Sequence, residues 1–319
     1  MASFAQDAPP GVELERAPCE LCGADEPRPV AWRTDLFLGG ETVYTHCRCG
    51  GCGVLYQHPR PTAATIGRLY PDEEYPEYVP GLHTETPLRR AVRRYGLRKR
   101  CARVTRYVPA GRALDVGCST GDFAWEMGRQ PGWAAFGIDI SRGAVSYAGD
   151  QLGVAGGVAV LNAAPFADGS FDAITMWNVF EHVYDPRAAV AEAARLLRPG
   201  GALVITHPNL DSLDRRLFGH TWIGYELPRH LYLFPSDLLR DLMAEHGLTE
   251  VERSCFYGSH AATMTSLMFL VEARLGRGRA AGLARRALFS LPARILCAPY
   301  FLLIDRLRLG SNITAVFRS

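Results

Sequence analysis

Short apolar runs alternate with amphipathic stretches from Arg112 onward. The apolar runs predict strands, and the stretches with apolar residues three and four apart predict helices between them. Because strands that alternate with helices form parallel sheets covered on both faces, we predict an α/β fold with a doubly wound sheet. The predicted strands are Ala113–Gly117, Ala134–Ile140, Val158–Leu161, Ala173–Trp177 and Ala202–Thr206. The predicted helices are Asp122–Gln130, Arg142–Leu152 and Arg187–Leu197.

A strongly basic helix, Leu88–Tyr107, is predicted before this region. It holds nine basic residues and no acid between Arg89 and Arg106. Its apolar positions form a partial stripe, so we expect one face to pack while the arginines face water. The alternative is RNA binding, which the net charge of +2 does not favour.

The C-terminal third predicts a helix at Ser236–Gly247 and two closing strands, Val251–Phe256 and Ile313–Phe317. Between these strands, residues 261–307 are helical in pattern and unusually apolar. We expect them to cap a lipophilic pocket, and the alternatives are dimerisation or contact with a membrane surface.

The composition is that of a globular protein, with 48% hydrophobic and 21% charged residues. No apolar stretch reaches the roughly 20 residues that a membrane-spanning helix needs, and no apolar leader opens the chain. Nine cysteines without a secretory signal indicate a reducing compartment, where paired cysteines bind metal more often than they form disulfides. We therefore expect a cytoplasmic protein without a transmembrane span.

Two CxxC pairs dominate residues 19–60, which hold too little apolar material for a core of their own. Each pair suits a tight turn around one edge of a metal ion, and four thiolates suit tetrahedral zinc. We predict a small zinc-ribbon-like module in which structural Zn²⁺ supplies the folding free energy. Unliganded reduced thiols are the alternative, and His46 and Cys47 are spare donors. The predicted ligands are Cys19, Cys22, Cys49 and Cys52.

A glycine turn follows the first predicted strand, where residues 113–121 read ALDVGCSTG. Glycines let a ligand approach the backbone, and the following helix presents free N–H groups. Asp115 lies in the strand, where its carboxylate would orient the turn or receive a ligand ammonium group. Asp139 ends the next strand, 18 residues after Gly121, where an acid accepts both hydroxyls of a ribose. A turn of this kind also suits other nucleotides.

Four segments together resemble the class I methyltransferases that use S-adenosylmethionine. They read LDVGCSTG, GIDIS, PFADGSFDAITMWNVFEHVYDP and RLLRPGGALVITHPN, and they cover residues 113–210. The resemblance implies a Rossmann-like seven-stranded sheet of order 3-2-1-4-5-7-6, with strand 7 antiparallel. It also implies the following cofactor-binding residues: Asp115, Gly117, Cys118, Gly121, Asp139, Ile140, Asn162 and Asn178.

Methyl transfer needs an acceptor held beside the cofactor and, where necessary, a base. His182, with its neighbour Glu181, is the first candidate because it follows the fourth strand, although the two residues also suit support of the next helix. The resembling ubiquinone O-methyltransferases carry Glu-x-x-Glu-His here, and Asn178 replaces the first acid, so we expect no catalytic metal. The loop 221–230 is either a wall of the acceptor pocket or a seal on the core. Its candidate catalytic residues are Tyr225 and His230.

The paired CxxC turns, the PRP sequence at 59–61 and a tyrosine-rich connector resemble bacterial methyltransferases of secondary metabolism and surface glycans. We therefore predict a methyltransferase for a small metabolite or a glycan or nucleotide-sugar intermediate. The alternatives are an RNA methyltransferase and a non-catalytic binding protein. The predicted divisions are a flexible lead-in at 1–18, the zinc module at 19–60, a connector with the basic helix at 61–108, and a methyltransferase domain at 109–319 with a helical insertion at 259–310.

Overall fold

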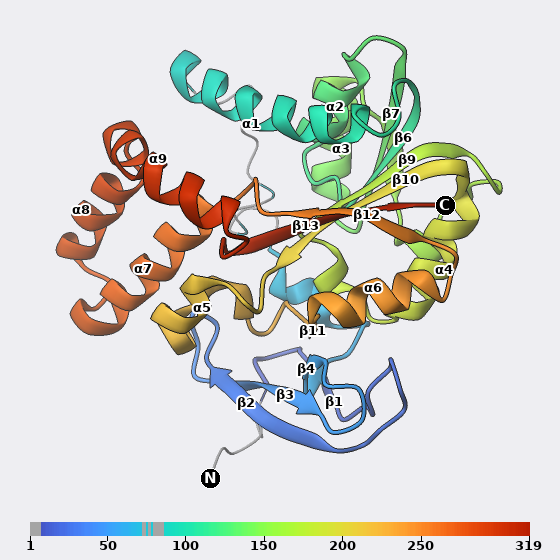
Figure 1. Cartoon of the computed structure of the whole chain (residues 1–319). Coiled ribbons are helices and arrows are strands. Elements are labelled where there is room, and N and C mark those ends of the chain that lie inside the picture. Colours follow the sequence, from blue (N-terminus) through green and yellow to red (C-terminus); the bar gives the residue numbers. More distant parts are fainter. Residues whose placement is uncertain (1–7, 72–74, 76–77, 79–85) are drawn as a thin grey trace. The chain divides into compact units, whose positions relative to one another are not determined.

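The computed structural model describes residues 8–71, 75, 78 and 86–319 (Figure 1). The predicted lead-in at 1–18 and the connector at 61–108 extend partly outside these residues. The chain forms two compact units. The first comprises the chain up to Leu69, His207–Leu239 and Arg253–Thr314, and the second comprises Tyr70–Thr206, Arg240–Glu252 and Ala315–Ser319.

A seven-stranded sheet confirms the predicted α/β fold. Its strand order is β8-β7-β6-β9-β10-β13-β12, which is 3-2-1-4-5-7-6 when the strands are numbered along the chain. The pairs from β8 to β10 are all parallel. The strands are β6 (Gly111–Val116), β7 (Trp133–Asp139), β8 (Ala155–Val158), β9 (Phe171–Trp177), β10 (Leu197–Pro208), β12 (Thr249–Ser254) and β13 (Asn312–Arg318).

Strand β13 runs against β10. The Gly200 amide donates to the Ser319 carbonyl, and the Asn209 amide donates to the Ser311 carbonyl. Since the partner number falls as the β10 number rises, the two strands are antiparallel, as the resemblance implies.

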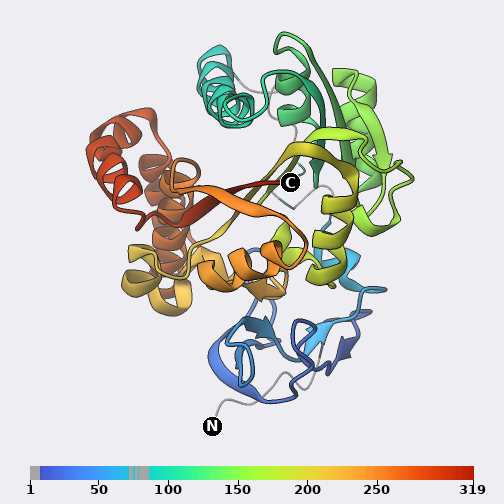
Figure 2. The same cartoon turned by 45° about the vertical axis from the view of Figure 1, so that its right-hand side comes forward.

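The helices begin close to where the pattern predicts them. Figures 1 and 2 show α1, α2 and α3 on one face of the sheet and α4 on the other. Helix α4 begins because the Asp185 side chain accepts a hydrogen bond from the Ala188 amide and Pro186 fills the first turn. The helices are α1 (Pro87–Thr105), α2 (Asp122–Gly128), α3 (Arg142–Leu152), α4 (Pro186–Leu196) and α6 (Ser236–Ala244).

Strand β8 lies three residues before the predicted start, at Ala155 rather than Val158. Gly156 and Gly157 carry no apolar side chain, so the pattern of hydrophobic residues does not report them. A Cβ at Gly156 would collide with the backbone of Gly137 on β7. Glycine is required there because the two strands approach closely.

Helix α1 does not simply expose its arginines. Four arginines of α1 and Arg106 directly after it form ion pairs with acids of the second unit. Arg98 and Arg106 face water as expected, with 63% and 68% of their side chains exposed, whereas Arg103 is largely buried. Glu126, on α2, is 2% exposed and accepts two of these guanidinium groups. The pairs are Arg93–Asp122, Arg94–Glu126, Arg98–Glu126, Arg103–Glu252 and Arg106–Glu252.

The first unit contains a four-stranded sheet of order β11-β4-β3-β2. Strand β11 (Tyr232–Leu233) comes from far along the chain and pairs Tyr232 with Tyr56. The sequence pattern does not predict β2, because its two prolines interrupt the alternation. The other strands are β1 (Leu14–Glu15), β2 (Pro27–Arg33), β3 (Tyr44–Cys49), β4 (Leu55–Gln57) and β5 (Arg60–Pro61).

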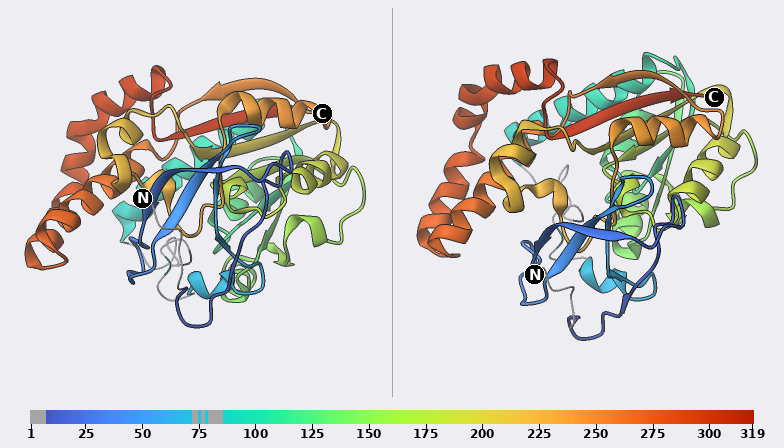
Figure 3. Two further views of the ribbon diagram at one scale, coloured as in Figure 1. Left: turned by 90° about the horizontal axis from the view of Figure 1, so that it is seen from below. Right: turned by 60° about the horizontal axis from the view of Figure 1, so that its bottom comes forward.

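The apolar C-terminal stretch folds as three helices of the first unit, as its pattern predicts. Figure 3 shows α7, α8 and α9 running together, and each contacts the other two. Among the described residues, no single helix is long and apolar enough to cross a bilayer. Helices α8 and α9 meet these two criteria only when they are taken together, as a pair bent by 60°. The helices of this part are α5 (Leu213–Phe218), α7 (Ser259–Leu275), α8 (Arg279–Leu288) and α9 (Leu291–Arg306).

Candidate functional site

The predicted glycine turn joins β6 to α2 in the second unit. Gly117 and Gly121 have φ angles of 68° and 82°, which favour glycine. A Cβ at Gly121 would lie 2.7 Å from the Cβ of Ala148 on α3, and one at Gly117 would collide with Val179. Both glycines are therefore fixed by conformation and by close packing, and the turn presents the N-terminus of α2.

Asp139 ends β7 as a buried, firmly held acceptor. Its Oδ2 accepts from the Ser119 amide at 2.9 Å, and its Oδ1 accepts from the Ser141 amide at 2.9 Å. The Tyr78 hydroxyl donates to Oδ1 at 3.3 Å. A carboxylate has about four lone-pair positions, so these three contacts orient Asp139 and leave about one position for a further hydroxyl, to which displacement of the Tyr78 hydroxyl would add a second.

Asp115 lies inside β6 and holds the centre of the sheet. It is 4% exposed, and its Oδ1 accepts from the Thr175 hydroxyl on β9 at 2.7 Å. Burial raises the pKa of Asp115 to about 7, against the opposing effect of the Thr175 hydrogen bond. Two roles are expected for Asp115, to orient the turn or to receive a ligand ammonium group. The contact with Thr175 supports the first, because it positions the strand before the turn.

This pKa predicts a pH-dependent stability. The pKa of Asp115 is about 7 in the folded protein, against an ordinary value of 3.8 for this group, so between these values the folded protein binds more protons than the unfolded chain. Its contribution to the free energy of unfolding is therefore lost as pH rises toward 7. We expect Asp115→Asn to become more stable relative to the parent by about 1–3 kcal/mol between pH 5 and pH 8.

Urea unfolding of the cofactor-free parent and variant at both pH values measures this difference. A difference in stability that is the same at pH 5 and pH 8 would contradict the raised pKa.

The remaining predicted cofactor residues surround the same strand ends. Asn178 follows β9 with a φ of 55°, and its Oδ1 is buried without a hydrogen-bond partner among the described residues. Ile140 is 47% exposed directly after Asp139, which leaves an apolar surface for a flat ring. Asn162 is exposed on a short 3-10 helix, Leu161–Ala163. Cys118 is buried beside β7, so only its backbone faces the turn.

These residues suit an adenosyl cofactor. A glycine turn, a fixed carboxylate and an exposed apolar side chain lie at the ends of adjacent strands, and an orphaned amide oxygen follows β9. Ligands of this fold bind at the carboxyl ends of the parallel strands.

Three tyrosines of the connector join this site, and no motif in the sequence marks them individually. The rings of Tyr70, Tyr75 and Tyr78 contact one another in series, with centroids 5.0 and 5.2 Å apart. Tyr78 reaches Asp139, and the Tyr70 hydroxyl lies 2.9 Å from Nδ1 of His182. The only sequence signal was the density of tyrosine between Leu69 and the first helix.

The predicted catalytic pair lies on a short 3-10 helix, Phe180–His182, after β9. Glu181 is fully buried, whereas His182 is half-buried and its ring meets that of Tyr70 at a centroid distance of 6.1 Å. His182 is therefore held by a hydrogen bond and by an aromatic contact.

The other two candidates, Tyr225 and His230, lie in the first unit. Tyr225 is 5% exposed, packs against Trp222 and accepts a hydrogen bond from the Arg215 guanidinium at 3.2 Å. Nδ1 of His230 contacts the carbonyl of Gly224 at 2.8 Å. Trp222 and Tyr225 thus belong to a buried cluster, as expected of a seal on the core.

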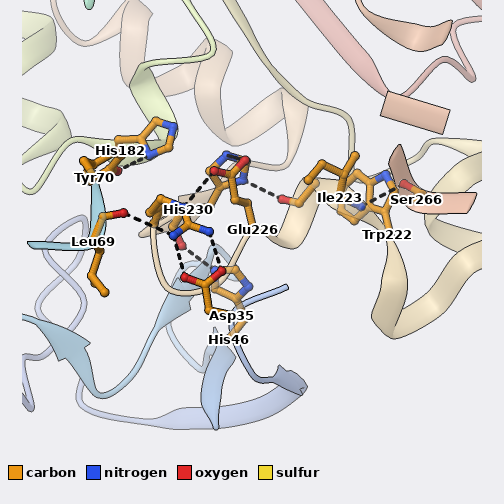
Figure 4. A network of polar contacts seen from close by, with 12 residues as sticks. Asp35, His46, Leu69, Tyr70, His182, Trp222, Ile223, Glu226, His230 and Ser266 are labelled. Atoms are coloured by element: carbon orange, nitrogen blue, oxygen red, sulfur yellow. Dashed lines mark hydrogen bonds and ion pairs between the residues drawn. The ribbon is translucent and has the colours of Figure 1, made fainter. Parts of the chain in front are cut away.

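Arg229, in the same loop, is fully buried. Figure 4 labels its partners Asp35, Leu69 and Glu226. Asp35 accepts two hydrogen bonds from its guanidinium at 2.7 and 2.8 Å, and Glu226 accepts a third at 3.0 Å. The carbonyl of Leu69 accepts a fourth at 3.3 Å. A buried charge needs such partners, so Arg229 fixes the loop to the segment after β2 and to the end of the 3-10 helix Ile66–Leu69.

The four predicted zinc ligands converge in the first unit. All four thiol sulfurs lie within 4.8 Å of one another. Cys19 and Cys52 have sulfurs 3.7 Å apart, and Cys22 and Cys49 have sulfurs 3.4 Å apart. Tetrahedral zinc with Zn–S bonds of about 2.3 Å requires sulfurs roughly 3.8 Å apart, so the donor set fits the ion.

The two CxxC turns share one geometry. Gly23 donates its amide hydrogen to the carbonyl of Cys19, and Gly53 donates to that of Cys49. Both glycines have positive φ angles, 74° and 79°. The two spare donors have other partners. Nε2 of His46 contacts the carbonyl of His230, and the Cys47 thiol points to the carbonyl of His58.

The strand order places the protein in the class of α/β proteins with a seven-stranded, mostly parallel sheet, and comparison with known sequences identifies the family. The methyltransferase domain family matches residues 82–253. Because this match covers more than half of the chain, the protein belongs to that family.

Relatives with assigned names include two quinone methyltransferases. The ubiquinone/menaquinone biosynthesis C-methyltransferase UbiE of Geobacter sulfurreducens is 36% identical over 119 residues, which are 34% of this chain and 46% of that protein. The demethylmenaquinone methyltransferase of Roseiflexus castenholzii is 32% identical over 167 residues, covering 44% of this chain and 69% of that protein. The chain thus spans about half of the UbiE protein it matches.

Among solved structures, the cyclase SpnF superposes with a TM-score of 0.50 at 20% identity. The match covers 82% of this chain and 97% of that one. At this identity the likeness shows the fold alone, and a protein named as a cyclase shares it, so the fold by itself does not determine the reaction.

Proposed function

We propose that this protein is an S-adenosylmethionine-dependent methyltransferase that acts on a small organic acceptor. The observation that carries the proposal is the pair of buried carboxylates at the ends of β6 and β7, on either side of a glycine turn. The relatives named for quinone biosynthesis support a small acceptor. The ion pairs of α1 argue against RNA, because many of its arginines already bind carboxylates.

The test uses the full chain and cofactor labelled at the methyl group. Transfer of label to a small quinol-like, sugar or other metabolite acceptor, but not to RNA, is the expected result. Label transferred to RNA would establish the first alternative. Binding of S-adenosylhomocysteine without turnover on any of these acceptors would favour a non-catalytic binding protein.

S-Adenosylmethionine supplies an activated methyl group when bound. In our proposal, Asp139 binds the ribose hydroxyls, and Gly117 and Gly121 shape the pocket for the methionine end. His182 removes the acceptor proton. We infer the tautomer in which its Nδ1–H donates to the Tyr70 hydroxyl, because Nε2 then carries the lone pair that can take up that proton. Tyr70 is thus a positioning residue.

Loss of the proposed base has a defined expected effect. His182→Ala should lower kcat by about 100-fold or more, the usual contribution of a general base, while calorimetry shows unchanged affinity for S-adenosylhomocysteine. Tyr70→Phe should lower kcat less and shift the acidic limb of the kcat–pH profile, because the histidine loses its partner.

His246→Ala, in the same unit but outside the site, is the matched control. Full activity of His182→Ala would remove this histidine from the mechanism, and an unchanged pH profile in Tyr70→Phe would remove Tyr70 as its positioning residue.

We also propose that Cys19, Cys22, Cys49 and Cys52 bind one structural zinc ion. The matching turns and the sulfur separations support it. A Cβ at Gly51 would lie 3.0 Å from the sulfur of Cys22, so the backbone is wrapped closely around the donor set. Four protein thiolates leave no open position for substrate. This site suits a cytoplasmic protein, whose thiols stay reduced.

A further inference from the structure

Helix α9 is apolar around its whole circumference. Phe301 and Ile304 are buried against α7 and its neighbours. On other faces Ile295, Leu296 and Leu302 are 65%, 82% and 71% exposed. A helix that is hydrophobic on all sides normally has apolar surroundings on all sides, so the exposed part of α9 lacks a partner within the described chain.

The exposed residues form a continuous stripe. Positions 295, 299, 302 and 303 recur at intervals of three and four residues along α9, and side chains at this spacing share one helix face. Leu283 on α8 adds an exposed leucine. Isolated exposed leucines are ordinary, but a contiguous patch of this kind marks an interaction surface. We call Leu283, Ile295, Leu296, Leu302 and Leu303 the leucine face.

The charged residues around this face are mostly basic, and the one acid in α9, Asp305, accepts a hydrogen bond from Ser259. Residues 273–304 contain six arginines and neither aspartate nor glutamate. Arg279 and Arg286 lie at helical spacing beside Leu283, three or four residues to either side. Four of these arginines form no ion pair with a described residue, namely Arg279, Arg285, Arg286 and Arg294.

We propose that the leucine face docks onto the surface of an anionic lipid bilayer. The leucines and isoleucine enter the boundary between headgroups and acyl chains, while the long arginine side chains reach the lipid phosphates. The excess of positive charge favours lipid over a second copy of the chain, because a face rimmed mainly by arginine repels its own copy and attracts anionic headgroups. The bend between α8 and α9 suits helices lying along the surface.

Co-sedimentation of the full chain with vesicles tests the proposal. We expect binding to phosphatidylcholine vesicles that contain phosphatidylglycerol to be at least about 10-fold tighter than to phosphatidylcholine alone, and to weaken as salt screens the arginines. Replacing two exposed leucines, Leu296→Glu with Leu302→Glu, should lower the affinity at least about 10-fold. Arg285→Glu with Arg286→Glu should remove the preference for the anionic lipid.

Leu217→Glu, an equally exposed leucine on α5, is the matched control and should bind like the parent. Unchanged melting temperatures and S-adenosylhomocysteine affinity show that the variants fold and separate this test from that of the proposed function. Two outcomes would overturn the proposal. In the first, the parent protein does not bind any vesicle. In the second, vesicle binding is absent and sedimentation shows a dimer that Leu296→Glu dissociates.

Discussion

Asp139→Ala is expected to lower the affinity for S-adenosylhomocysteine by about 100-fold or more. A hydrogen bond to a charged group contributes about 1.5–3 kcal/mol, and a ribose offers two hydroxyls to this carboxylate. A loss of roughly 3 kcal/mol corresponds to about two orders of magnitude in the dissociation constant. Titration calorimetry on the full chain measures this change directly.

Two variants separate ribose binding from general damage. Asp150→Ala removes an exposed acid from α3 and should bind like the parent. Tyr78→Phe removes the hydroxyl that now contacts Asp139, and because it frees an acceptor position it should bind the cofactor as tightly or more tightly. Unaltered affinity in a folded Asp139→Ala protein would reject the assignment of Asp139 to the ribose.

Removal of zinc is expected to unfold the sheet of β2, β3 and β4. Structural zinc sites of four thiolates contribute about 10 kcal/mol or more of apparent binding free energy at pH 7, and this sheet has few apolar residues to replace that term. Cys22→Ser should reduce the metal content from one ion per chain to nearly none. Since Cys22 is exposed, the substitution itself disturbs little packing.

Metal analysis and hydrogen exchange of β3 amides are the measurements for this variant. Cys47→Ser is the control, because Cys47 lies beside the cluster but its thiol points to the carbonyl of His58; it should retain zinc. Full protection of β3 in a metal-free Cys22→Ser protein would show that packing alone holds the sheet.

Local signals in the sequence predict the second unit well. Helix α3 spans Arg142–Leu152 as expected, because Ser141 caps its start and Gly153 ends it. The same is true of the glycine turn and Asp139, since a strand followed by a tight turn has few conformations available. The shift of β8 has the opposite cause, because glycine residues carry no hydrophobic pattern.

Contacts between segments that lie far apart in the chain could not be predicted from the sequence. Nothing around Tyr232 indicates that it pairs with Tyr56, and nothing around Asp35 indicates that it holds Arg229. The links from Tyr70 to His182 and from Tyr78 to Asp139 are of the same kind. Such pairings depend on how the chain returns, and hydrophobic periodicity carries no information on that.

The pairing of β11 with β4 has a consequence for how this protein is made. Strand β4 leaves the ribosome about 170 residues before its partner at Tyr232–Leu233. During that interval the edge of the nascent cysteine-rich sheet is uncovered. Early capture of zinc would keep those few strands together, so metal supply during translation should govern the yield of native protein more than metal supplied afterwards.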